Sequence, residues 1–250
     1  MMLSIVSPIY RAENIVEKLV LEIKKEIQKL DISFEIILVD DRSPDNSWKK
    51  MIGLSKKYSN VKSIRLSRNF GQHPAIMAGL SFAKGEWIVV MDCDLQDQPK
   101  EIISLYEKSK EGYDIVLARR TNRKDSFFKK LSSKIFSKIY GFFTDTKYDN
   151  EIANFGIYNK KAIQSILQVS DYIKFFPLFV NFVGYNATSI EVEHAPRNSG
   201  STSYRISKLI SLAFNSIISF SNKPLKIFVK FGMIISFLSF ITTFRINASP

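Results

Sequence analysis

Two carboxylates and an amide that lie close together in the sequence are the side chains best suited to chemistry. Asp92, Asp94 and Gln96 follow an apolar stretch, residues 87–91, which is typical of a buried strand. In an extended chain, residues two apart point to the same side, so these side chains would face one ligand. Neighbouring carboxylates repel unless a cation lies between them, and hard oxygen ligands favour Mg2+ or Mn2+. The pattern predicts a divalent metal that would bind a diphosphate, with ordinary loop acids as the alternative.

Polar residues also follow the other apolar stretches. Asp40 and Asp41 come directly after residues 34–39, where they could accept hydrogen bonds from a base or ribose, or cap a helix. Tyr10 follows Pro8 at the end of the first apolar stretch. Its ring could stack on a base or belong to the core.

A third group lies where a strand is expected to turn into a helix. Arg68 and Gly71 precede residues 72–83, which read as helical. A glycine allows close approach of a ligand, and the amino terminus of a helix attracts anions. Arg119 and Arg120 follow the fifth expected strand.

The elements that must position these residues alternate along the first half of the chain. Ser43 is expected to cap a helix that starts at Pro44. This order predicts an α/β fold with a mostly parallel sheet and helices on both faces, whose ligands bind at the carboxyl ends of the strands. The expected strands are residues 3–6, 34–39, 61–66, 87–91 and 114–118, and the expected helices are residues 12–30, 72–83 and 99–108.

The second half of the chain is more basic and more apolar. Residues 127–143 read as a basic, aromatic helix, and residues 206–220 as an amphipathic helix that either lies in a membrane interface or packs on a core. Residues 231–244 are uncharged and apolar, and residues 225–230 extend them to the roughly 20 residues that span a membrane. A buried core helix is the alternative. The expected domains are a catalytic domain (residues 1–204), an amphipathic interfacial helix (residues 205–223) and a membrane-associated or transmembrane helix (residues 224–245).

Composition narrows the class of partner. The 250 residues carry a net charge of +12, and many of the basic residues flank the apolar segment, which favours an anionic membrane surface over nucleic acid. A solvated basic face is the alternative. No zinc-ligand or RNA-binding pattern is present. Cys93 is the one cysteine, so no internal disulfide can form. The first ten residues read as a strand and not as a signal peptide, so the catalytic part is expected in the cytoplasm.

Taken in order, these segments resemble glycosyltransferase family 2. The similarity rests on Pro8-Ile9-Tyr10, on residues 39–45 (VDDRSPD), on residues 68–72 (RNFGQ) and on residues 91–97 (MDCDLQD). It continues in residues 197–204 and 219–225. Within the family, the chain looks like the polyprenyl-phosphate glycosyltransferases, which include dolichyl-phosphate mannose synthase.

The resemblance implies a GT-A fold and an inverting transfer from a nucleotide sugar, expected to be a UDP-sugar, to polyprenyl phosphate at the inner membrane. A homo-oligomer is left open. Cys93 is interpreted as filler, that is, a residue that only occupies space between the two acids and does not act as a nucleophile. The implied roles are nucleotide binding by Pro8, Tyr10, Asp40, Asp41, Arg68, Gly71 and Asp92, metal binding by Asp92, Asp94 and Gln96, catalysis by Asp94, Arg119 and Arg123, and acceptor binding or a lid by Arg197, Ser201, Ser203 and Tyr204.

Two features depart from the family pattern. Asn154-Phe155-Gly156 stands where an Asp-Phe-Arg segment is common. A hydroxyl acceptor needs a general base, whereas a phosphomonoester with a second pKa of about 6 is already ionised at neutral pH. The alternatives are a different sugar, or replacement of the missing acid by Asp149 or Glu151, which lie close by in the sequence. The family also usually has a second membrane helix.

The residues leave three alternative functions. One is a catalytically dead membrane scaffold, which predicts no metal-dependent binding of a nucleotide sugar. A related enzyme that glycosylates a glycan hydroxyl is the close alternative. A dinucleotide-binding oxidoreductase would need Gly-x-Gly-x-x-Gly after the first strand, where the chain has Ser7-Pro8-Ile9-Tyr10. The histidines His73 and His194 are expected to have a structural role or to lie on the surface.

Overall fold

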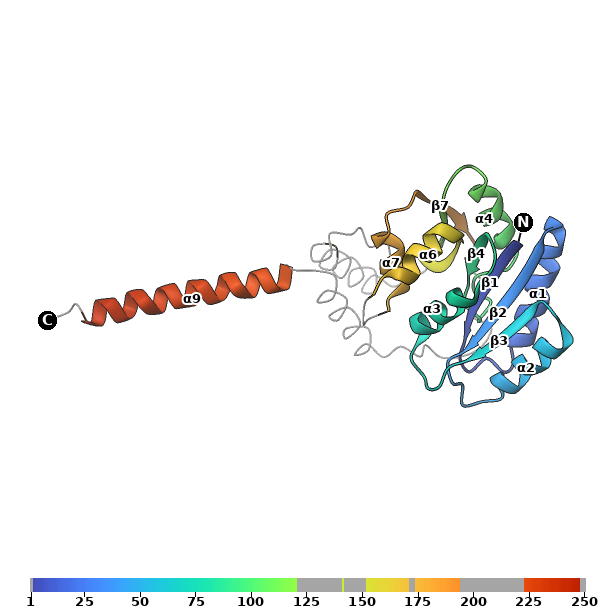
Figure 1. The fold of residues 1–250 in the computed structure, drawn as a ribbon, viewed down its shortest axis with the longest axis horizontal. Helices are drawn as coiled ribbons and strands as arrows, with labels where there is room; N and C mark the ends of the chain where they lie inside the picture. Colours follow the sequence, from blue (N-terminus) through green and yellow to red (C-terminus); the bar gives the residue numbers. More distant parts are fainter. Residues whose placement is uncertain (1, 121–140, 142–151, 171–173, 194–222, 248–250) are drawn as a thin grey trace. The chain divides into compact units, whose positions relative to one another are not determined.

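A computed structural model describes residues 2–120, 141, 152–170, 174–193 and 223–247 (Figure 1). The chain divides into two compact units. One unit comprises residues 1–126 and 149–201, and the other comprises residues 127–148 and 202–250.

A seven-stranded sheet forms the centre of the first unit, with the strand order β3-β2-β1-β4-β6-β5-β7. β6 is antiparallel to both of its neighbours, β4 and β5, and every other pairing is parallel. All strands except β6 therefore end at the same edge, here called the carboxyl edge. The strands are β1 (Met2–Ile9), β2 (Ser33–Asp40), β3 (Val61–Arg65), β4 (Trp87–Val90), β5 (Ile115–Arg120), β6 (Ile152–Asn159) and β7 (Ala187–Val192).

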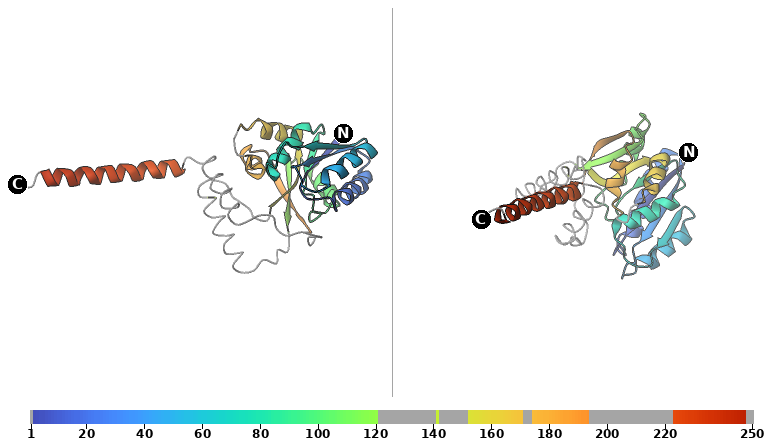
Figure 2. Two further views of the ribbon diagram at one scale, coloured as in Figure 1. Left: turned by 90° about the horizontal axis from the view of Figure 1, so that it is seen from below. Right: turned by 60° about the vertical axis from the view of Figure 1, so that its left-hand side comes forward.

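Helices cover both faces of the sheet (Figures 1 and 2). On one face lie α1 (Val16–Ile27), which continues into the 3-10 helix η1 (Gln28–Leu30), α2 (Ser47–Lys57) and α4 (Glu101–Ser109). On the other face lie α3 (Gln72–Phe82), α6 (Lys160–Gln168) and α7 (Phe176–Phe182). The alternation of strands and helices explains this arrangement, because each parallel pair needs a crossover that returns over the sheet.

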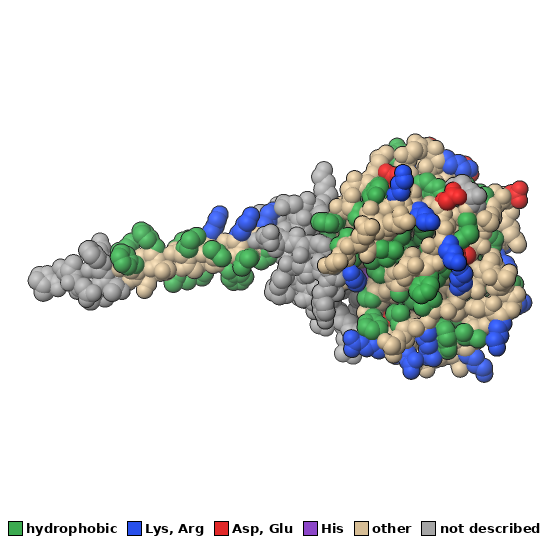
Figure 3. Space-filling view, viewed as in Figure 1, with side chains coloured by type: hydrophobic (Ala, Val, Ile, Leu, Met, Phe, Trp, Pro, Cys, Tyr) green, Lys and Arg blue, Asp and Glu red, His purple; other side chains and the backbone are tan. Residues whose placement is uncertain are grey.

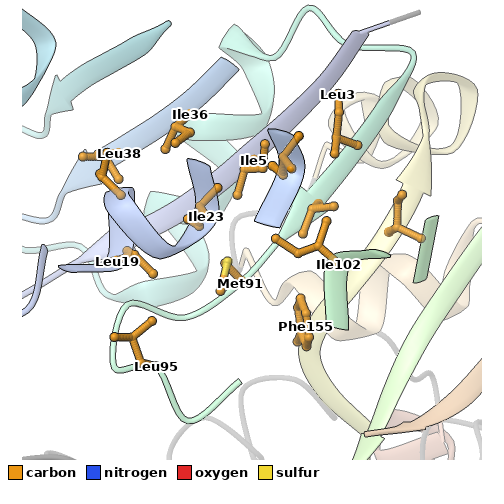
Figure 4. Packing of buried hydrophobic residues seen from close by; sticks show 14 of the residues in the cluster. Leu3, Ile5, Leu19, Ile23, Ile36, Leu38, Met91, Leu95, Ile102 and Phe155 are labelled. Carbon is orange, nitrogen blue, oxygen red and sulfur yellow. The ribbon is translucent and has the colours of Figure 1, made fainter. Parts of the chain in front are cut away.

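The core of the first face is made by apolar residues with helical spacing on α1 and alternating residues on the strands. Leu19 and Ile23 of α1 point towards Ile36 and Leu38 of β2, with Ile5 of β1 beside them (Figure 4). All five side chains are fully buried. Because both faces of the central strands are covered, they read as continuous apolar runs.

Most of the expected elements are confirmed, with ends that differ by a few residues. The expected start of α2 is wrong, since the helix begins at Ser47 and Ser43 does not cap it. Asp45 accepts hydrogen bonds from both the backbone N–H and the hydroxyl of Ser47, so residues 44–46 form a turn before the helix. β6, α6, α7 and β7 were not expected from the sequence. The helices expected over residues 127–143 and 206–220 lie outside the described residues.

In the second unit, the apolar segment forms one long helix, α9 (Lys223–Asn247). Its residues 223–242 have a mean hydropathy of 1.8, and none of this span is buried. The helix is therefore long and apolar enough to cross a membrane. Lysines lie only towards its amino-terminal end, at positions 223, 226 and 230 (Figure 3).

A glycine in α3 sets how closely that helix approaches the sheet. A Cβ atom added at Gly79 would lie 2.4 Å from Val6 Cγ1 and 2.9 Å from Val39 Cγ2. We expect Gly79→Ala to lower the free energy of unfolding by about 1–3 kcal/mol, because the packed sheet must shift to admit the methyl group. Thermal unfolding of the full chain in detergent, followed by circular dichroism, measures this change.

Gly53→Ala is the matched control, because Gly53 is helical and nothing lies within 4 Å of its added Cβ. It should leave stability unchanged or raise it by about 0.5–1 kcal/mol, the usual gain from alanine in a helix. Equal effects of the two substitutions would contradict the close packing of α3.

Candidate functional site

The motifs of the first half meet at the carboxyl edge because β1, β2, β3 and β4 are parallel neighbours. In the sheet register Ile9 pairs with Asp40, Asp40 pairs with Arg65, and Val6 pairs with Val90. The segments that follow these strands therefore start side by side. They contain Tyr10, Asp41, residues 68–71 and residues 92–96.

Residues 92–96 form a turn, called the acidic turn below. β4 ends at Val90, and Cys93 and Asp94 already lie in the turn. The expectation of an extended chain here is wrong, because Leu95 adopts a left-handed backbone with φ 58° and Asp94 Oδ1 accepts a hydrogen bond from the Gln96 N–H at 3.1 Å. A side chain that bonds the backbone two residues on is a common way to close such a turn. Asp92, Asp94 and Gln96 are all half-buried within it.

Gln72, at the start of α3, was not singled out from the sequence but contacts the acidic turn. Its Nε2 donates a hydrogen bond to Asp92 Oδ1 at 2.6 Å. The signal was present, since Gln72 closes the RNFGQ segment. The amide holds one oxygen of Asp92 in place and ties α3 to the predicted metal site.

The acidic turn could hold a metal only together with ligand oxygens. Among the described residues, no group of three or more His, Cys, Asp or Glu side chains is placed to bind a metal ion. Two carboxylates and a neutral amide suit Mg2+ or Mn2+, which accept oxygen ligands from water and phosphate in addition to the protein. The donor set thus fits a metal that is shared with a diphosphate.

Asp41 organises the loop that precedes α3. Its Oδ1 accepts a hydrogen bond from the Phe70 N–H at 2.7 Å, and its Oδ2 accepts one from the Gly71 N–H at 2.8 Å. Gly71 has a φ of 98° and directly precedes the helix. Burial raises the pKa of the Asp41 carboxyl, and the two N–H donors lower it in part. The sequence predicts that the start of α3 binds an anion. For these two N–H groups, that anion is the Asp41 carboxylate of the chain itself.

Asp40 is fully buried and bonded within the chain. Its Oδ1 accepts a hydrogen bond from the Ser43 N–H at 2.9 Å, and its Oδ2 lies 3.0 Å from Arg65 Nε in an ion pair. Asp40 therefore links the ends of β2 and β3. Its contact with a nucleotide stays a prediction, as does that of Asp41.

The end of β1 presents an aromatic ring. Pro8 is buried, whereas Tyr10 is 38% exposed, and the Arg11 guanidinium lies 5.4 Å from the centre of its ring. Beneath the loop, burial raises the pKa of the Cys93 thiol to about 12, although the Tyr10 N–H hydrogen bond opposes this shift. A thiol that stays protonated is a poor nucleophile, which supports the interpretation of Cys93 as filler.

The basic residues of the predicted site are only partly described. Arg119 is half-buried near the end of β5, and the exposed Arg68 places its guanidinium 4.7 Å from the centre of the Phe70 ring. His73 packs edge-on against Phe175 with ring centres 4.7 Å apart, and burial lowers its pKa to about 4. The remaining predicted residues, Arg123, Arg197, Ser201, Ser203 and Tyr204, and also His194, lie outside the described residues.

The segment that departs from the family pattern begins β6. Val90 pairs with Gly156, so Asp92 and the half-buried Asn154 lie two residues beyond this pair, at the carboxyl edge. A Cβ atom added at Gly156 would lie 2.9 Å from the backbone oxygen of Val116. The sheet therefore cannot accept an arginine at position 156 without a shift of β5.

The two bonds of the Asp41 carboxylate generate a prediction about the loop. In Asp41→Asn, the amide group would turn an N–H towards a backbone donor, and a buried donor left unsatisfied costs about 1–3 kcal/mol. We expect the free energy of unfolding to fall by that amount, as measured by chemical denaturation in detergent. Asp31→Asn is the control, because Asp31 is an exposed acid in a left-handed position that asparagine accepts. Unchanged stability of Asp41→Asn would contradict the role of the carboxylate.

The sequence and the fold both match known glycosyltransferases. The profile of Glycosyl transferase family 2 matches residues 4–167. An uncharacterized glycosyltransferase of Synechocystis is 36% identical over 238 residues, which cover 95% of this chain and 75% of that protein. The undecaprenyl-phosphate 4-deoxy-4-formamido-L-arabinose transferase of Proteus mirabilis is 35% identical over 239 residues, which cover 95% of this chain and 73% of that protein.

Among solved structures, the fold is similar to that of glucosyl-3-phosphoglycerate synthase from Mycobacterium tuberculosis in complex with Mn2+, UDP and phosphoglyceric acid. The TM-score is 0.62 at 12% sequence identity, and the match covers 85% of this chain and 74% of that one. This likeness confirms a GT-A-like fold. Since the family profile covers more than half of the chain and the relatives align over nearly all of it, the protein is a glycosyltransferase that belongs to Glycosyl transferase family 2.

Proposed function

We propose that the protein transfers a sugar, with inversion, from a UDP-sugar to polyprenyl phosphate, and that the transfer needs Mg2+ or Mn2+. The observation that carries the proposal is the position of the acidic turn. Asp92 and Asp94 follow the strand β4 at the carboxyl edge, directly beside the end of β1, and the end of β2 lies one strand further on. Ligands of open α/β sheets bind at this edge.

The order of the strands suggests how the donor lies. Neighbouring strands are about 5 Å apart, so a diphosphate at the β4 end places the nucleoside over the ends of β1 and β2. Tyr10 would stack on the base, with Pro8 shaping the loop beneath it and Arg68 on the far side. Asp40, Asp41 and Gly71 would support this surface through the hydrogen bonds of the loops.

Asp92, Asp94 and Gln96 would hold the metal. When bound, the ion supplies positive charge that stabilises the departing nucleoside diphosphate. The solved relative that contains Mn2+ and UDP supports this use of a divalent ion. Gln72 would keep the Asp92 carboxylate oriented, because its amide already donates to Oδ1.

In the transfer, an oxygen of the acceptor phosphate forms a bond to the anomeric carbon while the bond from that carbon to UDP breaks. The electron pair leaves with the β-phosphate of UDP, and no proton has to move. Arg119 and Arg123 would contact the phosphates, and residues 197–204, with Arg197, Ser201, Ser203 and Tyr204, would cover the site. The Asn154 amide cannot accept a proton as an aspartate carboxylate in its place could. This supports an acceptor that is already ionised when it binds.

A lipid acceptor is supported from two sides. The Proteus mirabilis relative is named for undecaprenyl phosphate, and helix α9 is long and apolar enough to span a membrane. The lysines at the start of α9 suit the cytoplasmic face, where basic residues gather. We place the catalytic domain, residues 1–204, on the cytoplasmic side of the inner membrane, with residues 205–223 at the interface.

The metal site generates the first test. In Asp94→Asn, the side chain keeps its shape but loses its charge, so transfer should fall by at least about 100-fold, since the metal supplies several kcal/mol to the transition state. EDTA should abolish transfer by the wild type, and added Mn2+ or Mg2+ should restore it. Glu107→Gln is the control, because Glu107 is an exposed acid on α4. Near-normal transfer by Asp94→Asn would remove the metal assignment.

The acceptor needs a separate test. The purified full chain is incubated with a panel of radiolabelled nucleotide sugars and either undecaprenyl phosphate or undecaprenol. We expect label to move into the organic phase only with undecaprenyl phosphate and a UDP-sugar. In a parallel incubation with a glycan acceptor, label that enters the glycan and never the lipid would instead support the glycosylation of a glycan hydroxyl.

A further inference from the structure

Two arginines at the carboxyl edge have a backbone conformation that arginine rarely adopts. Arg11 has a φ of 53° and Arg42 a φ of 56°, both in the left-handed region. Glycine and asparagine enter this region at little cost, whereas a long side chain does so at a penalty. We infer that Arg11 and Arg42 read the base of the nucleotide donor and select uracil. This inference rests on the proposed function.

The two residues occupy equivalent positions on neighbouring strands. Ile9 of β1 pairs with Asp40 of β2, so Arg11 and Arg42 each lie two residues beyond the last pair. Parallel strands are about 5 Å apart, so the two guanidinium groups project from adjacent points of the same edge. One ligand could contact both.

The loops that carry the arginines are bonded to each other and fix this placement. The Arg11 N–H donates to Ser43 Oγ at 3.2 Å, and the Ala12 N–H donates to Ser47 Oγ at 2.8 Å. In return, the Asn46 N–H donates to Glu13 Oε2 at 2.7 Å. These bonds fix the backbone of Arg11 and join its loop to the loop that carries Arg42.

Both side chains are exposed, and no ion pair among the described residues involves either of them. The Arg11 guanidinium instead lies over the ring of Tyr10, at 5.4 Å from its centre. Unlike Arg65, which pairs with Asp40, these two arginines are not neutralised by a carboxylate of the described residues. The charge of Arg11 thus lies beside the ring that is proposed to stack on the base.

The chemistry of the guanidinium identifies the part of the donor that fits. An arginine side chain carries five N–H donors and no acceptor, and it binds carbonyl oxygens or stacks on flat rings. Uracil presents two carbonyl oxygens, whereas cytosine replaces one of them with an amino donor. β1 and β2 lie one and two strands away from β4, so these donors meet the base and not the diphosphate. Two such donors favour uracil over cytosine.

The test measures the dissociation constants of UDP and CDP for the full chain in detergent with Mn2+. We expect the wild type to prefer UDP. In Arg11→Asn and in Arg42→Gly, UDP should bind about tenfold more weakly, as expected when a charge-assisted hydrogen bond is lost, and the preference over CDP should shrink. Arg42→Lys keeps the charge without the fork of donors and should lie between. The melting temperatures of the Asn and Gly variants should not fall, because both new residues suit a left-handed backbone.

Asp31→Gly is the matched control, because Asp31 also has a left-handed backbone, with φ 49°, but precedes β2 and so lies at the opposite edge. It should bind UDP like the wild type. Wild-type affinity and selectivity in both arginine variants would overturn the inference, and so would an equal loss in Asp31→Gly. A wild-type protein that binds no nucleoside diphosphate would overturn the proposed function itself, which is a different result from loss in the variants alone.

Discussion

The site depends on the parallel pairing of β1 with its neighbours. β1 pairs with β2 along its whole length and with β4 on its other side, so the chain leaves three strands at the same edge. Parallel strands require crossovers through helices, which return each time to the opposite edge. The segments after β1, β2 and β4 are therefore brought together although they are far apart in sequence. Any slip of this register would move Tyr10 away from the loops that hold it.

Bringing acidic loops together at one edge has a cost in charge repulsion, and the fold divides the acids between two tasks. Asp40 and Asp41 are buried and turn their oxygens to the chain's own N–H groups and to Arg65. These two carboxylates stabilise the loops. Asp92 and Asp94 are half-buried in their turn, so part of each side chain stays exposed to solvent. Four acids in similar motifs thus have different environments, and burial separates the two supporting acids from the two proposed to bind metal.

Much of this arrangement could be predicted from the sequence, because apolar runs that end in acids mark strands and their carboxyl ends. The shape of the acidic turn could not, since it depends on the left-handed Leu95 and on the bond from Asp94 to the backbone. The start of α2 was missed for a similar reason, because Asp45 and not Ser43 bonds the first turn. The left-handed Arg11 and Arg42 carry no local signal, as the usual residues there are glycine or asparagine.

The position of β6 between β4 and β5 could not be predicted from the sequence either. Its antiparallel pairing depends on contacts between residues that are distant along the chain. It has a consequence for the chemistry. The glycine at position 156 lets β6 lie close to β5, and the same change removes the basic group of the family segment. Asn154 removes the acid at the same edge as Asp92. In the described part of β6, neither the acid nor the basic group of the family segment is therefore present. This supports the proposed acceptor, because a phosphate dianion brings its own negative charge to the attack on the sugar.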